Sequence, residues 1–522
     1  MKPKGITINP AEKRTFKSKF SGYLCRPKQK TYFMSRHFFN IVLLLFTIVL
    51  FVVSSCRKDD PIDTSPSLKL SFSTDTLIFD TVFSTIGSVT QTLKVYNPSD
   101  KKIKISSIYL AGGGTSRYAL NVDGTAGTSF QDVEIAGNDS LWVFVRVTID
   151  PGAGNLPFIV TDSIFFETNG NEQDIDLVAW GQNARFILWD TDRPNLPKYK
   201  IVAGEGVDTT WTSDLPIVIY GYAVVDSTGS LTINAGTKIY FHKGSGLWIY
   251  KGGSLKVQGT IDEPVYFDSD RLESFYSDLP GQWDRIWLNE GSVNNEINYA
   301  VIRNGFIGIQ AETLNEYMGN QLNLTNTIIE NMSGAGILTR YYLIASYNCV
   351  IANCGQYAVA LTLGGSYDFR HTTIANYWNY NYRQTPSVLL NNYVVDQQGV
   401  TYAYPFSAHF ANTIIYGNQS NEFYIDKNTE EEFTAVFDHC LLRTEEDISN
   451  TEMYIDCLKN LDPKFVEYAT NNYELDTLSP AIDAGSMEIA NTVPVDIKGV
   501  DRTQSPDLGA YERVQPSEKD EL

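Results

Sequence analysis

The chain has 522 residues and a formal net charge of −20 at pH 7, with 41 basic and 61 acidic side chains. Such an acidic surface repels nucleic acid and anionic membranes, which argues against both as direct partners. Hydrophobic residues make up 43% of the chain, which at this length is ample for two hydrophobic cores.

Residues 1–55 have the composition of an export signal. They contain ten Lys or Arg residues and one acid, Glu12, and a nearly unbroken apolar run covers 41–53. A run of this length suits the core of a signal peptide and is short for a membrane-spanning helix. Cys56 follows two small residues, Ser54 and Ser55. We therefore expect a signal peptide over 1–55, with Met34 as the expected start codon.

Val53-Ser-Ser-Cys56 resembles the lipobox of bacterial lipoproteins. The resemblance implies that Cys56 carries the lipid anchor. Arg57-Lys-Asp-Asp60 resembles the surface-export signal of Bacteroidetes lipoproteins, which implies an outer-membrane protein exposed at the cell surface. A signal anchor and a solvated charge cluster are the alternatives. The final Lys519-Asp-Glu-Leu522 matches an endoplasmic-reticulum retention signal, which we interpret as coincidence.

Residues 56–67 form a polar tether, and 68–185 show short alternating runs separated by turn residues. This pattern predicts a seven-stranded immunoglobulin-like β-sandwich. The expected strands are 68–72, 76–80, 88–96, 103–111, 141–147, 162–167 and 176–180. Residues 90–99 resemble the domains of the abnormal-spindle and hydin type, which implies a spacer; ligand binding by this domain is the alternative.

A six-residue motif recurs along the second half of the chain. Its starts are separated by 27, 22, 23, 41 and 27 residues, and its copies lie at 299–304, 326–331, 348–353, 371–376, 412–417 and 439–444. A β-rich motif with this period cannot bury its apolar face alone, so successive copies must stack as coils of a solenoid. The step of 41 contains an insertion or an extra coil.

Strand alternation predicts that the second and fourth motif positions point inward. The second positions hold small residues, which are Ala300, Thr327, Cys349, Thr372, Thr413 and Cys440. The fourth positions hold branched residues, which are Ile302, Ile329, Ile351, Ile374, Ile415 and Leu442. Asn tolerates left-handed backbone. We therefore expect a ladder of amide side chains at the corner formed by Asn304, Asn331, Asn353 and Asn376.

Short strands at 229–241, 246–250, 253–259 and 264–268 are separated by Gly turns, about three strands to a coil. With the motif and the stretch 281–288, this region resembles the right-handed parallel β-helix of the pectin-lyase-like superfamily. Residues 462–512 resemble the closing segment of bacterial surface β-helix proteins. The expected fold is all-β: an immunoglobulin-like sandwich, a right-handed parallel β-helix over 190–515, and a tail at 516–522.

The superfamily contains lyases, hydrolases, adhesins and inert scaffolds, so the fold does not define the function. A lyase would need a basic proton acceptor, aided by calcium or a second cation. The candidates are Arg370 and His371 beside Asp368, with Arg340 and Arg383 on neighbouring coils. His371 and His439 replace the usual Asn of the motif, so we interpret both as corner residues that substitute for an amide, and a catalytic role is the alternative. The paired-carboxylate phrases of the superfamily's polygalacturonases are missing.

The cysteines predict neither a zinc site nor a clear disulfide. No Cys-x-x-Cys or His-rich spacing occurs. Cys349 and Cys440 occupy the inward small position of the motif, which favours packed thiols. Cys354 could bond Cys349 only if their Cα atoms lie within about 7 Å. We expect no cofactor and no metal, with calcium the exception if the chain is a lyase.

Aromatic residues crowd the insertion between the motifs at 371 and 412, with Tyr377, Trp378, Tyr380 and Tyr382 the candidate binding residues. Loops on rigid scaffolds carry function, and aromatic rings suit the faces of sugar rings. Packing of the insertion on itself is the alternative. We expect a lipid-anchored surface protein whose β-helix binds a polysaccharide or a surface protein without catalysis. A polysaccharide lyase or other glycan-active enzyme, and a purely architectural spacer, are the alternatives.

Overall fold

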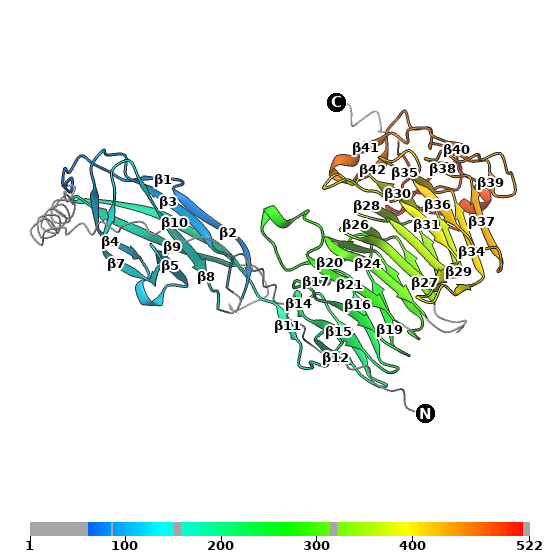
Figure 1. Cartoon of the computed structure of the whole chain (residues 1–522), viewed down its shortest axis with the longest axis horizontal. Coiled ribbons are helices and arrows are strands. Elements are labelled where there is room, and N and C mark those ends of the chain that lie inside the picture. Colours follow the sequence, from blue (N-terminus) through cyan, green and yellow to red (C-terminus); the bar gives the residue numbers. More distant parts are fainter. Residues whose placement is uncertain (1–60, 85–86, 151–157, 290, 314–320, 515–522) are drawn as a thin grey trace, which may run out of the picture. The chain divides into compact units, whose positions relative to one another are not determined.

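The computed structural model describes residues 61–84, 87–150, 158–289, 291–313 and 321–514. The expected signal peptide, Cys56 and the tail 516–522 lie outside the described residues. The sandwich and the solenoid both belong to the unit Ile62–Leu522. Its described part is nearly all β, with a sandwich (blue to cyan in Figure 1) and a solenoid of stacked parallel strands (green to orange).

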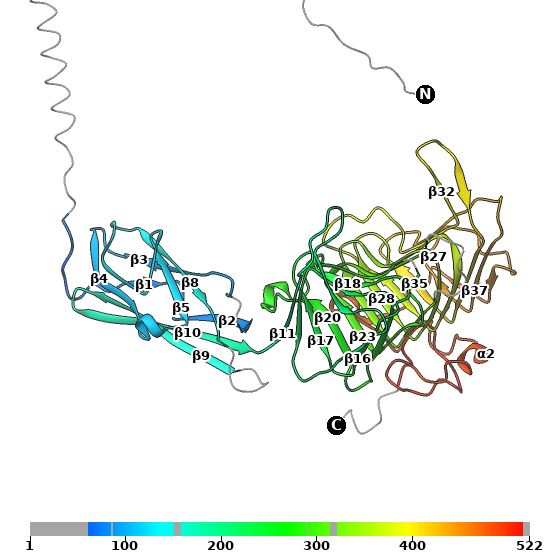
Figure 2. The same cartoon turned by 90° about the horizontal axis from the view of Figure 1, so that it is seen from below.

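Two five-stranded sheets form the sandwich in the described part of 71–182 (Figure 2). The first sheet has the order β1 (Ser71–Phe72), β3 (Gln91–Tyr96), β8 (Ser140–Val147), β5 (Tyr118–Val122), β6 (Thr125–Gly127). The second has the order β2 (Thr76–Phe83), β10 (Asn171–Gln182), β9 (Phe158–Thr168), β4 (Ile103–Leu110), β7 (Ser129–Ile135). The strands pair antiparallel except for β2 and β10, which run parallel. Buried Val143, Val145 and Phe166 belong to the core between the sheets.

Three strands of the sandwich, β5, β6 and β7, are missing from the sequence-based expectation of seven. β5 and β6 form a hairpin around Asp123 and Gly124, which both have left-handed backbone, with φ of 48° and 80°. Asp-Gly is the preferred pair for such a two-residue turn. The sequence Val122-Asp-Gly-Thr125 therefore contained the signal for this hairpin.

The solenoid is a parallel β-helix in which about three strands make one coil, as expected. The described residues of one side form an eleven-stranded sheet: β11 (Arg185–Leu188), β14 (Ile217–Tyr220), β17 (Lys238–Phe241), β20 (Val265–Ser269), β23 (Ala300–Arg303), β26 (Ile328–Met332), β28 (Val350–Cys354), β30 (Thr373–Asn376), β35 (Ile414–Gly417), β38 (Leu441–Leu442) and β40 (Leu458–Lys459). The repeated motif occupies this sheet from β23 onward.

The other sides belong to one sheet that has seventeen strands within the described ranges. Its members are β12 (Tyr199–Ala203), β13 (Asp208–Trp211), β15 (Tyr222–Val225), β16 (Ser230–Asn234), β18 (Gly246–Ile249), β19 (Ser254–Gln258), β21 (Trp283–Leu288), β22 (Asn295–Asn298), β24 (Gly305–Glu312), β25 (Gln321–Thr325), β27 (Ala335–Tyr347), β29 (Val359–Arg370), β31 (Val388–Asn391), β34 (Phe406–Ala411), β36 (Phe423–Asp426), β37 (Phe433–Asp438) and β39 (Tyr454–Ile455).

Both inward stacks predicted from the motif are confirmed. The small second positions and the branched fourth positions are all buried, and Cys349, Ile351, Cys440 and Leu442 are among those with no exposed surface. Stacking in register buries each side chain against its equivalents in the coils above and below, which is the main source of stability in a solenoid. The four cysteines of the described residues are free thiols.

The amide ladder is confirmed in part. The Asn331 side chain donates to that of Asn304 at 2.6 Å, whereas Asn353 bonds Asn471 and Asn376 bonds the Cys354 backbone. A second ladder lies at the start of the motif, where Asn348 donates to Asn326 at 3.0 Å and Asn326 donates at 2.9 Å to Asn298, which directly precedes its copy. The sequence predicted the left-handed corners but not which amides would be neighbours.

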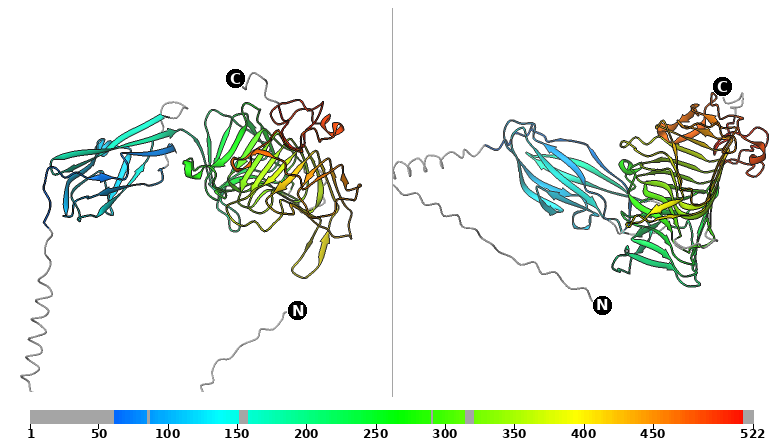
Figure 3. Two further views of the ribbon diagram at one scale, coloured as in Figure 1. Left: turned by 90° about the horizontal axis from the view of Figure 1, so that it is seen from above. Right: turned by 45° about the vertical axis from the view of Figure 1, so that its right-hand side comes forward.

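The step of 41 residues is one coil with an insertion. β30 pairs directly with β35, so no extra coil lies between them. β31 belongs to the coil itself, because it pairs with β29 and β36. The inserted residues include a hairpin of β32 (Tyr393–Val395) and β33 (Thr401–Ala403), which projects from the solenoid in yellow in Figures 2 and 3.

The segment 461–514 covers the outer face of the C-terminal part of the eleven-stranded sheet, over β26, β28, β30, β35 and β38. It contains β41 (Phe465–Glu467), β42 (Asn472–Leu475) and a short helix, α2 (Met487–Ala490). Tyr473 and Leu508 pack with the outward-facing Val350, Ala375 and Ile414 in one apolar cluster. The motif is apolar on both faces in these coils, so the sheet needs this cover. Among the described helices, none is both long and apolar enough to cross a membrane.

Candidate functional site

Four neighbouring parallel strands, β27, β29, β34 and β37, present a continuous outer face. Their register places Leu343, Ser366, Ser407 and Thr434 side by side in one row across the coils. Two residues further along the strands, a second row contains Ala345, Asp368, His409 and Val436. Because side chains alternate, both rows point away from the core.

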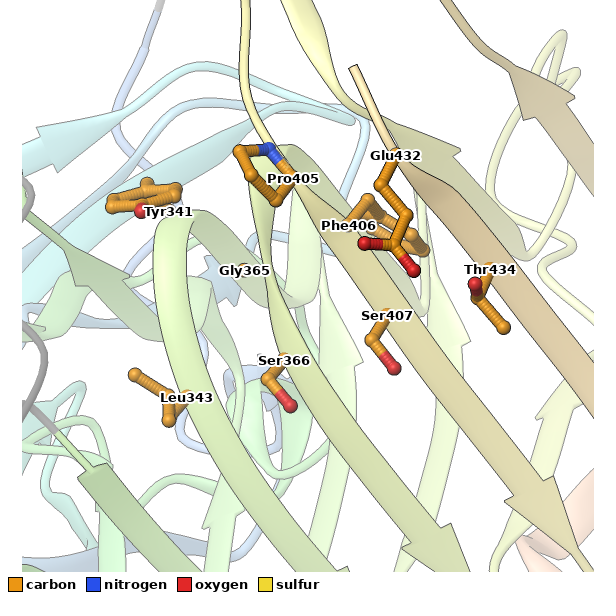
Figure 4. Close-up of a pocket in the computed structure, with 9 residues that line it drawn as sticks. All are labelled: Tyr341, Leu343, Gly365, Ser366, Pro405, Phe406, Ser407, Glu432 and Thr434. Carbon is orange, nitrogen blue, oxygen red and sulfur yellow. The ribbon is translucent and has the colours of Figure 1, made fainter. Parts of the chain in front are cut away.

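A pocket of about 240 Å³ opens on the first row (Figure 4). Tyr341 and Pro405 lie at its upper edge, Leu343 lies at one side, and the hydroxyl groups of the row line its floor. Glu432 contributes the one charged side chain among the lining residues. A second pocket shares Thr434 and continues over Tyr424 and Lys427. We call this outer surface with its two pockets the groove.

The backbone is bent where the groove begins. Tyr341 and Leu363 have φ of 49° and 61°, and Gly364 and Gly365 have φ of 84° and 113°. Non-glycine residues in this region are strained and cluster at functional sites. A Cβ on Gly365 would lie 2.4 Å from the carbonyl oxygen of Tyr342, so only glycine fits there. The bend brings the Tyr341 ring to 5.2 Å from that of Tyr404.

The predicted residues Asp368 and Arg370 lie on the same face as the groove. Their side chains form an ion pair at 2.7 Å, and the Tyr347 hydroxyl donates to Asp368 at 3.2 Å. His409 lies 3.5 Å from Asp368 on one side and 3.8 Å from Asp438 on the other. The result is a row of alternating basic and acidic groups across three coils.

The charged side chains of Asp368 and Arg370 in this row compensate each other. Burial raises the pKa of Asp368, but hydrogen bonds from His409 and Arg370 outweigh it and leave that pKa below its ordinary value. Burial lowers the pKa of Arg370, but its bond to Asp368 outweighs burial and raises that pKa. A guanidinium held in its charged form is a poor proton acceptor, and so is a carboxylate with a lowered pKa.

His371 does not join this row. Its side chain is fully buried, and its Nε2 accepts a hydrogen bond from the Asn412 amide at 3.0 Å. Burial, aided by the nearby Arg502 charge, lowers the pKa of His371 well below its ordinary value. It therefore stays neutral and lies at a corner in place of Asn, as the motif indicates. Arg383 is also buried, in an ion pair with Glu422 at 2.6 Å.

The four predicted aromatic residues divide into two pairs. Tyr377 stacks on Tyr468 with ring centroids 4.3 Å apart, and Trp378 is buried with its indole nitrogen donating to Asn381 at 3.0 Å. Tyr380 and Tyr382 are exposed, Tyr382 by 80%. None of the four lines the groove. The described residues contain no group of three or more His, Cys, Asp or Glu placed to hold a metal ion.

His409 is the residue of this face that the sequence interpretation missed. The signal for it was present, because the motif copies at 371 and 412 align Asp368 with His409, each three residues before its copy. Tyr341 and Pro405 were harder to find. Tyr341 lies at a register shift inside β27, and Pro405 directly precedes β34. The repeat does not specify the partners of either residue.

No family model matches this chain, and no curated protein matches it. Among solved structures, it is similar to a family 123 glycoside hydrolase from Clostridium perfringens, with 10% identity, a TM-score of 0.17 and coverage of 24% of this chain and 30% of that one. It is also similar to the E. coli chaperone DraB, with 11% identity, a TM-score of 0.16 and coverage of 22% of this chain and 54% of that one. The chain thus spans well under two thirds of both proteins.

The structure of XylC in complex with xylose covers 84% of this chain and 88% of its own, at 8% identity and a TM-score of 0.35. At these scores, none of the three similarities establishes a function for this chain.

Proposed function

We propose that this chain is a lipid-anchored surface protein whose β-helix binds neutral glycan chains in the groove without cleaving them. The pocket between Tyr341, Pro405 and the row of hydroxyl groups carries this proposal. A sugar ring has an apolar face and an edge of hydroxyl groups, and the pocket offers an aromatic ring beside hydroxyl partners.

The size and charge of the pocket narrow the ligand. Pockets for drug-sized molecules measure about 300–1,000 Å³, so 240 Å³ suits a single ring of a longer chain. The second pocket gives the neighbouring sugars a place along the strands. Glu432 would repel an acidic sugar at this position, which favours a neutral glycan.

Binding is favoured over catalysis by the chemistry of the neighbouring row. Asp368 and Arg370 neutralise each other, and His371 has no access to solvent. A lyase needs an uncompensated base within reach of its substrate. His409 is the one group of this row that keeps the alternative of a glycan-active enzyme open, because it lies beside the pocket row and is partly exposed.

Replacement of Tyr341 by Ala is expected to weaken retention of the chain on a neutral polysaccharide by about tenfold, the loss typical of an aromatic anchor. Affinity electrophoresis through gels containing xylan, galactomannan or mixed-linkage β-glucan measures it. Tyr382→Ala, which removes an exposed Tyr outside the groove, is the control and should bind like wild type. Ser407→Trp, which fills the pocket from an exposed position, provides a second variant with an intact Tyr341.

Two results would contradict this proposal. Unchanged retention in both Tyr341→Ala and Ser407→Trp would show that the groove does not hold the glycan. Release of unsaturated or reducing ends, lost in Arg370→Ala or His409→Asn, would make the chain an enzyme.

The lipid anchor is tested separately. Growth with a labelled fatty acid should label the wild-type protein, and Cys56→Ala should abolish the label because the thiol is the expected attachment atom. Protease treatment of intact cells then distinguishes a surface protein, which is digested, from a periplasmic one. If the Cys56→Ala protein still carries the fatty-acid label, Cys56 is not the site of lipid attachment.

A further inference from the structure

The sandwich carries an exposed aromatic surface that the groove does not involve. On the outward side of β3 and β8, Trp142 is 48% exposed, Phe144 39% and Tyr96 36%. We call the outward side of the sheet β1-β3-β8-β5-β6 the sandwich face. Large aromatic side chains exposed together on a flat sheet are unusual for a spacer and typical of binding surfaces.

The register brings these rings together with a cation. Lys94 lies directly opposite Trp142, and Thr92 lies opposite Phe144. The Lys94 ammonium lies 5.1 Å from the ring centroids of both Tyr96 and Trp142, within cation–π distance. Trp142 and Phe144 are two residues apart on one strand, so their Cα atoms are separated by about 7 Å and both side chains point to the same face.

The charge of the sandwich face is opposite to that of the chain. Outward positions of this sheet carry Lys94 and Arg146 and no Asp or Glu, and they otherwise hold Ser71, Thr92, Tyr96, Ala119, Asn121, Ala126, Ser140, Trp142 and Phe144. A patch free of acids stands out in a chain with 61 of them. A local basic patch is what an acidic protein needs to attract an anionic ligand.

We propose that the sandwich face is a second binding site and that it takes an acidic polysaccharide, one that carries uronate carboxylates or sulfates. The aromatic rings pack against the apolar faces of successive sugar rings. Lys94 and Arg146 pair with the anionic groups, for which arginine offers two parallel donors. The two sites would then differ in ligand charge, neutral for the groove and anionic for the sandwich face.

The test uses the full chain and three acidic probes: polygalacturonate, alginate and chondroitin sulfate. Fully methyl-esterified polygalacturonate has the same backbone without the charges and serves as the matched ligand. Wild type should bind at least one acidic probe. If it binds polygalacturonate, it should bind this polymer more tightly than the methyl ester. Trp142→Ala should weaken binding about tenfold. Lys94→Ala/Arg146→Ala should remove most of the salt dependence.

Trp189→Ala is the matched control, because Trp189 is also exposed, by 42%, and also lies against a lysine, with Lys198 4.0 Å from its ring centroid. It should bind like wild type, and so should Tyr341→Ala in the groove. Binding of no acidic probe, wild-type affinity in Trp142→Ala, or equal affinity for the methyl ester would each overturn the proposal. If the groove variants retain neutral polysaccharides like wild type, the proposal for the groove fails, but the binding of acidic probes to the sandwich face is still measured. The two proposals are therefore tested independently.

Discussion

Replacement of Arg383 by Met is expected to lower the free energy of unfolding by about 3–5 kcal/mol, because it leaves the Glu422 carboxylate buried without its partner. Neither side chain of this ion pair is exposed. Arg383 donates to both oxygens of Glu422, at 2.6 and 2.9 Å, and also to the backbone oxygens of Thr385 and Asn376. Equilibrium unfolding in urea, followed by tryptophan fluorescence, measures the change.

Two further variants make this prediction specific. Arg383→Met/Glu422→Gln removes both charges while the Gln carbonyl still accepts from the Ser387 backbone, which donates to Glu422 at 3.0 Å in the wild type. The double variant should therefore be more stable than Arg383→Met alone. Lys498→Met breaks an exposed ion pair with Glu474 and should cost less than about 1 kcal/mol. Equal losses in Arg383→Met and Lys498→Met would contradict the prediction.

The same ion pair gives Arg383 a structural role inside the β-helix. The structure turns Arg383 inward, where it ties the insertion to the coil that contains Glu422. Sequence could not show this, because Glu422 is 39 residues away and follows no repeat position.

The repeated part of the fold was the part most open to prediction. The motif positions of Ile351 and Cys349 follow from period-two alternation, and stacking in register then fixes their neighbours. The strands β5 and β6 are short, so their clearest signal in the sequence is the turn pair Asp123-Gly124. The cover over the eleven-stranded sheet was visible in principle, since Val350 and Ile414 make the outward side of the motif apolar.

The two proposed binding surfaces were less predictable for a physical reason. The groove depends on left-handed backbone at Tyr341 and on a glycine contact at Gly365, and neither is part of the repeat. The sandwich face depends on register, which places Lys94 opposite Trp142 across two strands. Sequence shows which side chains alternate along one strand, but the partner on the next strand is fixed by pairing that it does not specify.

The attachment of the segment 461–514 is expected to weaken as the pH rises from about 4.5 to 8, because of Glu512. Its side chain is 6% exposed and lies 3.4 Å from Arg502. Burial raises the pKa of Glu512 to about 8, against the opposing effect of Arg502. In the unfolded chain the carboxyl group titrates near its ordinary value of 4.5.

The sign of the effect follows from proton binding. Below pH 4.5 both states hold the proton, and the contribution of Glu512 to stability is fully present. Between pH 4.5 and 8 only the folded state holds it, so the free energy of unfolding falls by up to about 1.4 kcal/mol per pH unit. Above pH 8 this contribution is lost. Glu330, whose pKa burial raises to about 7, acts in the same direction over a narrower range.

Glu512→Gln should flatten this dependence, since the amide does not titrate. Hydrogen exchange of the Leu508 and Ala510 amides, which donate to Ala481 and to the Thr373 hydroxyl, reports the local opening as protection factors corrected for pH. Wild-type protection should fall more steeply than that of the variant between pH 5 and 8. Glu474→Gln, at an exposed site, should keep the wild-type slope. Identical slopes in wild type and Glu512→Gln would show that this carboxyl group does not control how the segment holds to the β-helix.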